Sequence, residues 1–169
     1  MTNANLITTA GVKELGLIQA NVRDSILEVV IRRAQDFMVR PILGTSFFER
    51  LKEGIVAGDL NSDEIALLNN YIAPFITACC DGKAINALTL ELRAETAGKA
   101  KDEHIEPLNA VDSARLFDDI DESINGYKDI LIGFLKDNCD LFPTYKEYIC
   151  SFENVKPEQP STRTRVRFS

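Results

Sequence analysis

The chain has 169 residues, of which 45% are hydrophobic and 27% are charged, the composition of an ordinary globular protein. One domain of this length buries a substantial core. No apolar run reaches the ~20 residues of a membrane span, and the N-terminal residues lack the basic start and apolar stretch of a signal peptide. We therefore expect a protein without a membrane segment, made in the cytoplasm.

The charge is distributed unevenly along the chain. Residues 1–150 hold 15 Lys and Arg against 24 Asp and Glu, a net charge of −9, whereas residues 151–169 hold 4 against 2, a net charge of +2. A net-acidic body argues against general nucleic-acid binding, which depends on neutralising phosphates. A basic tail on an acidic body instead suggests docking onto an acidic neighbour.

The first two predicted helices lie in the N-terminal quarter. Thr9 caps a short helix that ends at Gly16, where a left-handed residue costs little. A main helix then extends from an Asn21–Asp24 cap to about Val39, because Pro41 disfavours helical backbone in the residue before it. The predicted apolar face of this main helix repeats at three- and four-residue steps: Val22, Ile26, Val29, Val30, Ala34, Phe37 and Met38.

Two further helical segments follow. Ser46 and Glu49 have the spacing of a capping box and open a short helix that ends near Gly58. The longest apolar pattern covers residues 62–88, and Pro74 inside it predicts a kink, because proline removes a backbone hydrogen bond and clashes with the preceding turn.

The helical period then fails over a polar insertion at residues 93–111. The sequence leaves open a hairpin turning near Gly98 and a mobile loop. A third main helix is predicted from residue 113 to 135, and Pro143 closes this segment before a last turn at 144–149. The outer side of the third main helix is acidic and includes Asp118, Asp119, Asp121, Glu122 and Asp129.

These patterns predict an all-α fold, a bundle of three main helices with one or two short ones. The helical domain covers residues 1–149, with the polar insertion as an appendage. Residues 150–169 form an extended C-terminal arm, since they contain two prolines and a Ser/Thr cluster.

The end of the arm alternates as a β-strand does. Arg163, Arg165 and Arg167 fall on one side, and Thr164, Val166 and Phe168 on the other. A lone strand is not stable in water, so a neighbouring chain is expected to hold it by adding it to a strand edge or hairpin. A free basic terminus is the alternative.

No residue constellation points to catalysis, a cofactor or a metal. The only histidine, His104, lies in the polar insertion, and the neighbouring carboxylates of the third main helix are expected to form a solvated face. Gly82-Lys83 lacks the glycine and hydroxyl residue of a phosphate-binding loop and lies within a helix. The cysteines, at positions 79, 80, 139 and 150, are expected to be reduced, buried thiols.

The order of these pieces resembles the head–tail connector (adaptor, or ring) proteins of tailed bacteriophages, including those of crAss-like phages. The resemblance covers roughly residues 6–148. It rests on L-I-T-T-A-G-V-K-E-L, on A-Q-D-F-M-V-R-P-I-L-G-T-S-F-F-E-R-L, on N-N-Y-I-A-P-F-I-T-A-C-C and on a final helix reaching D-L-F-P-T-Y.

The resemblance implies a structural virion protein, made in the host cytoplasm, that forms a closed, commonly twelve-fold ring at the head–tail junction. Its partners would be its own copies, the portal protein and other tail or ring proteins, and DNA would pass through the channel without specific binding. Such rings have no enzymatic activity and no cofactor. The expected interface residues are Arg163, Arg165, Val166, Arg167 and Phe168 of the arm, and Gly98, Lys99 and Lys101 of the insertion.

The alternative hypothesis is a small helical regulatory or binding module whose basic tail contacts nucleic acid. It predicts salt-dependent DNA binding that is lost when Arg163, Arg165 and Arg167 are replaced.

Overall fold

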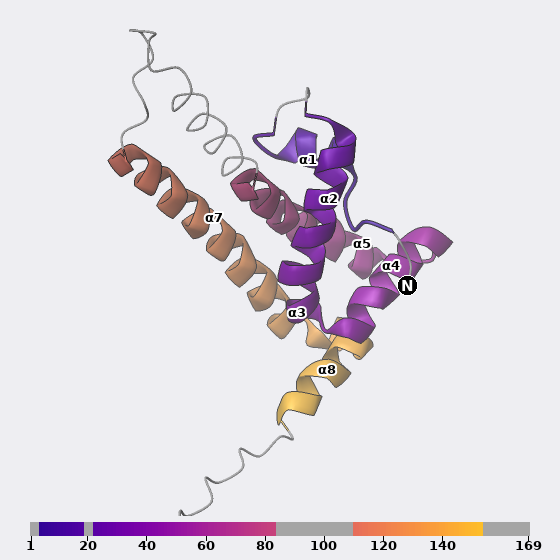
Figure 1. Ribbon diagram of the computed structural model, residues 1–169. Coiled ribbons are helices and arrows are strands. Elements are labelled where there is room, and N and C mark those ends of the chain that lie inside the picture. The colour runs from indigo at the N-terminus through magenta and orange to yellow at the C-terminus, as the bar shows by residue number, and fades with distance from the viewer. Residues whose placement is uncertain (1–3, 19–21, 84–109, 154–169) are drawn as a thin grey trace, which may run out of the picture.

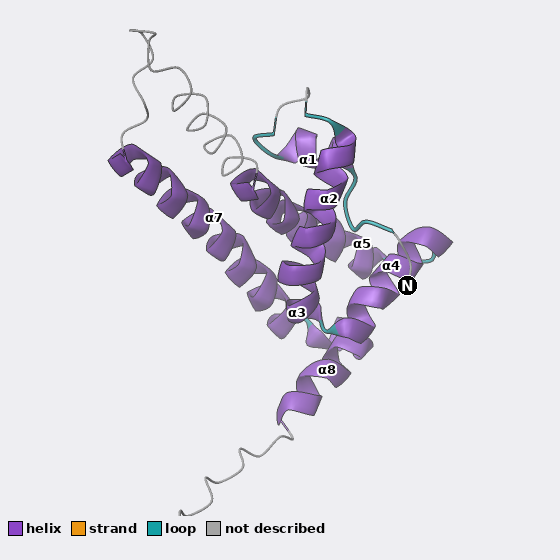
Figure 2. Cartoon of the chain, viewed as in Figure 1, coloured by secondary structure: helices purple, strands orange, loops and turns teal. Residues whose placement is uncertain are grey.

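The computed structural model describes residues 4–18, 22–83 and 110–153, and all the regular structure in these ranges is helical (Figures 1 and 2). The predicted all-α class is therefore confirmed for this part of the chain. The α-helices are α1 (Thr9–Leu15), α2 (Asp24–Ala34), α3 (Arg40–Leu43), α4 (Thr45–Ala57), α5 (Ser62–Leu67), an unlabelled helix over residues 73–83, α7 (Ala110–Asp137) and α8 (Pro143–Glu153). No helix in the described ranges is long and apolar enough to cross a membrane.

Two long helical columns and α7 form the body of the molecule (Figure 1). The first column is α2 with its continuation to Leu43, and the second runs from α5 to residue 83. The second column contacts α7, and α4 leads from the end of the first column to the start of the second. The short helix α8 packs against α4, and its last turns extend away from the other helices (Figure 1).

Each column contains one π-helical turn directly before a proline. These turns cover Gln35–Val39 and Leu68–Ile72, and each ends two residues before its proline, Pro41 or Pro74. The first backbone N–H beyond each turn donates to the carbonyl five residues back. A proline ring clashes with the carbonyl four residues before it, and the wider π turn accommodates the ring without ending the helix.

The predicted end of the first main helix at Val39 is therefore wrong, because the helical backbone continues through Pro41 to Leu43. The irregularity expected at Pro74 takes the form of the second π turn.

The apolar face predicted for α2 is wrong in part: Ala34 is buried and Val22 and Val30 pack against the core, but other members do not. Ile26, Val29 and Phe37 are exposed, and the buried side of the column instead carries Leu27 and Ile31, followed by Ala34, Gln35 and Val39. Apolar residues surround most of this helix, so spacing alone could not select the buried stripe. Gln35 belongs to the buried stripe because its amide binds the N-terminal segment: Oε1 accepts from Leu6 N–H at 3.0 Å, and Nε2 donates to Asn5 Oδ1 at 3.1 Å.

The predicted capping box of Ser46 and Glu49 does not form. Helix α4 begins at Thr45, which places Ser46 inside the first turn, and no side chain caps this end. The capping box lies instead at α5: Asn61 Oδ1 accepts from Glu64 N–H at 2.8 Å, and Glu64 Oε2 accepts from Asn61 N–H at 2.9 Å. Helix α4 ends at Ala57, directly before Gly58, as predicted, and Gly58 has a left-handed conformation.

Two other predicted boundaries change. Thr8, not Thr9, caps α1 through a hydrogen bond from Gly11 N–H. Pro143 begins α8 instead of closing the segment, since the first helical position needs no N–H. Helix α8 extends to Glu153, so the extended arm does not begin at Cys150. The rest of the arm and most of the 93–111 insertion lie outside the described residues, where the predicted hairpin also falls.

Helix α8 is fixed to the body by Tyr148. Its hydroxyl donates to the carbonyl of Pro41 at 3.0 Å, and its ring lies against Gly44. Gly44 has a φ of +75°, and a Cβ built there would lie 2.5 Å from the ring. The corner between α3 and α4 therefore requires glycine both for its backbone conformation and for the approach of Tyr148.

We predict that Gly44→Ala lowers the free energy of unfolding by at least ~1 kcal/mol, because alanine is strained at positive φ and the ring must move. Urea denaturation measures this change. The control is Gly126→Ala, at an exposed position of α7 with nothing within 4 Å, which should stabilise the protein by ~0.5–1 kcal/mol. Equal stability of Gly44→Ala and the parent protein would contradict the assignment.

Candidate functional site

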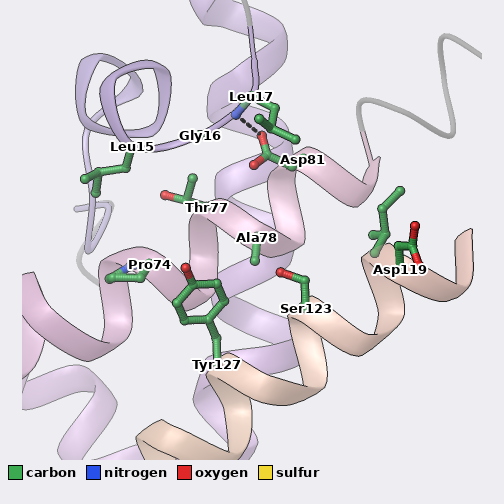
Figure 3. A pocket seen from close by; sticks show the side chains of 11 residues that line it. Leu15, Gly16, Leu17, Pro74, Thr77, Ala78, Asp81, Asp119, Ser123 and Tyr127 are labelled. Carbon is green, nitrogen blue, oxygen red and sulfur yellow. Dashed lines mark hydrogen bonds between the residues drawn. The ribbon is translucent and has the colours of Figure 1, made fainter. Parts of the chain in front are cut away.

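A cleft of about 520 Å³ opens between the end of α1, residues 73–83 and α7 (Figure 3). The segment after α1 and the helix 73–83 form one side, and α7 forms the other. Its lining consists of Leu15, Gly16, Leu17, Pro74, Thr77, Ala78, Asp81, Asp119, Ile120, Ser123 and Tyr127. Apolar walls with a few polar groups are typical of binding sites.

Gly16 brings the end of α1 against the helix 73–83. Its backbone is extended, with φ −108° and ψ −174°, so the predicted left-handed conformation is wrong. A Cβ at this position would lie 2.6 Å from Thr77 Cγ2 and 2.8 Å from Asp81 Oδ1. Glycine is thus needed for close approach, and not for its backbone freedom.

Asp81 connects the two segments of this side. Its Oδ1 accepts from the backbone N–H of Leu17 at 3.0 Å, a contact across 64 residues of sequence. Partial burial raises the pKa of Asp81, although hydrogen bonds from the N–H groups of Leu17 and Ile18 act in the opposite direction. The cleft therefore holds a carboxylate whose negative charge is incompletely solvated.

Thr77 supplies a buried hydroxyl without a partner. The residue is 3% exposed, and its Oγ1 makes no hydrogen bond. An unsatisfied buried hydroxyl costs roughly 1–3 kcal/mol, so such groups call for an explanation. Figure 3 shows Thr77 on the helix 73–83 and Tyr127 on α7, two residues that line the cleft from its two sides.

The acidic side chains of α7 do not form a single outward face. All five predicted members are exposed, as expected. Asp119, however, lines the cleft described above, and Asp121 lines a separate cleft with Met38 and Lys83 on the opposite flank of α7. Asp119 thus adds a second carboxylate to the cleft that contains Asp81.

The interface residues predicted from the sequence lie outside the described residues, as does His104. These are Gly98, Lys99, Lys101, Arg163, Arg165, Val166, Arg167 and Phe168. Gly82 and Lys83 are helical, which agrees with their exclusion as a phosphate loop. Within the described ranges, no group of three or more His, Cys, Asp or Glu side chains is placed to hold a metal ion.

The cysteine prediction is correct for two positions. Cys79 and Cys80 are buried, and burial raises the pKa of the Cys79 thiol to about 11 and that of Cys80 to about 12. These thiols are unreactive at neutral pH. The prediction is wrong for Cys150, which is exposed, and Cys139 is half-buried.

Sequence reasoning missed Gly16, Thr77, Asp81 and Tyr127. One signal was available: Thr77 and Asp81 are polar residues four apart inside a largely apolar helix, so they share one face. That spacing indicates a polar strip on a buried helix. It does not reveal that α1 and α7 meet beside the strip.

We predict opposite effects for two substitutions of Asp81. A raised carboxyl pKa means that the folded state holds the proton more tightly than the unfolded state, so this residue's contribution to stability falls as the pH rises and is least favourable at neutral pH. Asp81→Asn removes the charge, keeps an acceptor for Leu17 and should be at least as stable as the parent protein at pH 7. Asp81→Ala removes the acceptor and should cost about 1 kcal/mol.

Thermal unfolding across pH measures both effects. Any gain in Asp81→Asn should disappear at low pH, where the parent carboxyl is protonated in both states. Equal destabilisation by both substitutions would show that the fold needs the carboxylate itself.

Comparison with known proteins gives one match. The model of a "Family of unknown function (DUF6712)" matches residues 39–151. No curated protein and no solved structure matches the chain. The matched range includes Pro74, Thr77, Asp81 and the α7 side of the cleft, whereas the segment from Leu15 to Leu17 lies before it.

Proposed function

The chain belongs to the DUF6712 family of unknown function, and we propose that it is a structural virion protein that forms a closed ring between the portal and the tail of a bacteriophage. The ring continues the channel through which DNA leaves the capsid. Two kinds of support stand behind the proposal: the resemblance of residues 6–148 to head–tail connectors, and the exposed apolar side chains of the helical body.

The exposed apolar stripe of α2 carries the proposal. Ile26, Val29 and Phe37 recur at helical spacing on the side of the column away from the core, and Phe37 is 74% exposed. Single exposed apolar residues are ordinary, whereas several along one face are typical of a protein interface. On α7, Tyr127 and Ile130 are exposed as well. A ring subunit needs two different contact surfaces, one for each neighbour, and these two helices supply candidates for both.

The acidic exposure of α7 is compatible with a DNA channel. Asp118, Glu122 and Asp129 are exposed along this helix. Carboxylates do not neutralise phosphates, so a surface that bears them lets DNA slide without retention. The same exposed carboxylates disfavour DNA binding, so the DNA-binding regulator is the weaker of the two hypotheses.

We predict that Phe37→Glu weakens ring formation and leaves the monomer folded, because a charge on an exposed side chain affects stability by less than ~0.5 kcal/mol. The matched control is Val56→Glu on α4, at a residue that is 65% exposed and outside the stripe. Native mass spectrometry of the protein mixed with its portal measures assembly. Normal assembly of Phe37→Glu would remove the α2 stripe as a subunit contact.

We also predict that a chain ending at Glu153 keeps its helical circular dichroism and joins portal-bound rings less well than the full chain. The truncation point follows the end of α8, so no described helix is cut. If both chains join rings equally, the arm has no assembly role. If neither forms a ring with any portal or tail protein, the connector proposal itself is wrong.

The same preparations test the regulatory alternative. A mobility shift with DNA at low salt, abolished when Arg163, Arg165 and Arg167 are replaced, would favour a nucleic-acid-binding module.

A further inference from the structure

We propose that the cleft containing Asp81 and Thr77 is the receptor for the C-terminal arm of a neighbouring copy of this chain, which inserts residues 163–168. This inference rests on the proposed self-assembly and names the contact through which the arm acts. It is carried by the match between the groups in the cleft and those of the arm.

Charge is the first point of correspondence. The cleft contains the carboxylates of Asp81 and Asp119, and none of the described residues that line it is a Lys or Arg. The arm carries Arg163, Arg165 and Arg167, which would place successive guanidinium groups ~7 Å apart on one side if the arm binds in an extended conformation. An arginine beside Asp81 would complete the solvation of a carboxylate that burial leaves in an unfavourable setting.

The apolar groups also correspond. Leu15 and Leu17, which line the cleft, are 57% and 78% exposed, and Pro74 and Ile120 add further apolar lining. In an extended arm, Val166 and Phe168 would fall on the side opposite the arginines. A cleft lined by exposed leucines and by carboxylates therefore suits a segment that carries both kinds of side chain.

The hydroxyl of Thr77 gives independent support. An extended segment brings backbone N–H and C=O groups that need partners. Thr77 Oγ1 is buried and has no partner, and Ser123 and Tyr127 place further hydroxyls on the α7 side (Figure 3). The residues that line the cleft belong to helices and to the segment after α1, so the arm would be held there by side chains and not by strand pairing.

Chain length favours a neighbouring copy as the source of the arm. From Tyr127 to the end of α7 is about 15 Å at ~1.5 Å per residue, and the 11 residues of α8 add about 16 Å in a direction away from the body (Figure 1). Residues 154–162 span at most ~32 Å. Insertion into the cleft of the same subunit would leave the arm almost no slack, whereas a neighbour imposes no such limit.

Photo-crosslinking tests the contact in the full-length protein. We replace Phe168 with a photoreactive phenylalanine analogue and irradiate an assembled mixture of isotopically light and heavy chains. The expected crosslinks join the arm to the cleft near Leu17 or Tyr127 and link light to heavy chains. Crosslinks to another surface, or only within one chain, would overturn the proposal.

Binding of a fluorescent peptide of residues 158–169 to the full-length protein supplies the energetic test. The double substitution Asp81→Asn with Asp119→Asn should weaken binding at least ~5-fold, since it removes both carboxylates that the arginines of the arm would contact. The matched control, Asp118→Asn with Asp129→Asn, removes the same two charges from exposed positions of α7 outside the cleft and should change affinity less than ~2-fold. Equal effects of the cleft and control substitutions would show only long-range charge attraction and would refute the site.

Thr77→Val separates binding from folding. Removing a hydroxyl that has no partner should maintain or raise the unfolding temperature of the protein and should weaken its binding of the peptide. A variant that binds the peptide as well as the parent protein would exclude the hydroxyl from the contact. Peptide binding without ring formation would support the cleft assignment and refute the connector proposal. Ring formation without peptide binding to the cleft would support the connector proposal and refute the cleft assignment.

Discussion

The burial of one helix on every side organises this molecule. From Ile72 to Cys80 the second column has no exposed residue, and Phe75, Ile76 and Cys80 are fully enclosed. A helix that is apolar all round must be covered by neighbours on all sides. The end of α1 and helix α7 approach it, and small residues at Gly16 and Gly82 allow contacts that a Cβ would obstruct. The cleft lies between two of these covering elements, the end of α1 and helix α7.

The fold could be predicted where local chemistry decides it. Helix α4 ends directly before Gly58, because glycine adopts the left-handed conformation at little cost, and the all-α class followed from the apolar spacing. The buried stripe of α2 could not be predicted, because Ile26 and Leu27 are adjacent and both apolar, and only tertiary packing determines which of them is buried. The π turns could not be predicted either. A proline indicates an irregularity in a helix, but whether the helix ends there or continues through a wider turn depends on which residues beyond the proline become buried, here Leu43.

The candidate site was less accessible to prediction than the fold. The acidic exposure of α7 was correctly anticipated, but not that Asp119 and Asp121 would face different clefts. The pairing of Leu17 with Asp81 joins residues 64 apart, and nothing local to either residue specifies it. The sequence predicted a basic arm that needs a neighbour, whereas the cleft that we propose as its binding site depends on three-dimensional packing.

The two π turns have a consequence for how this chain can change in length. Each turn holds one residue more than an α-helical turn would need. That extra residue widens the turn enough to accommodate the ring of the nearby proline. Deleting one residue from the Gln35–Val39 turn would leave an ordinary α turn there and press the Pro41 ring against the carbonyl four residues before it, while the rest of the helix would keep its register. The extra residue of each turn is thus coupled to its proline, and loss of that residue would be tolerated best together with replacement of the proline.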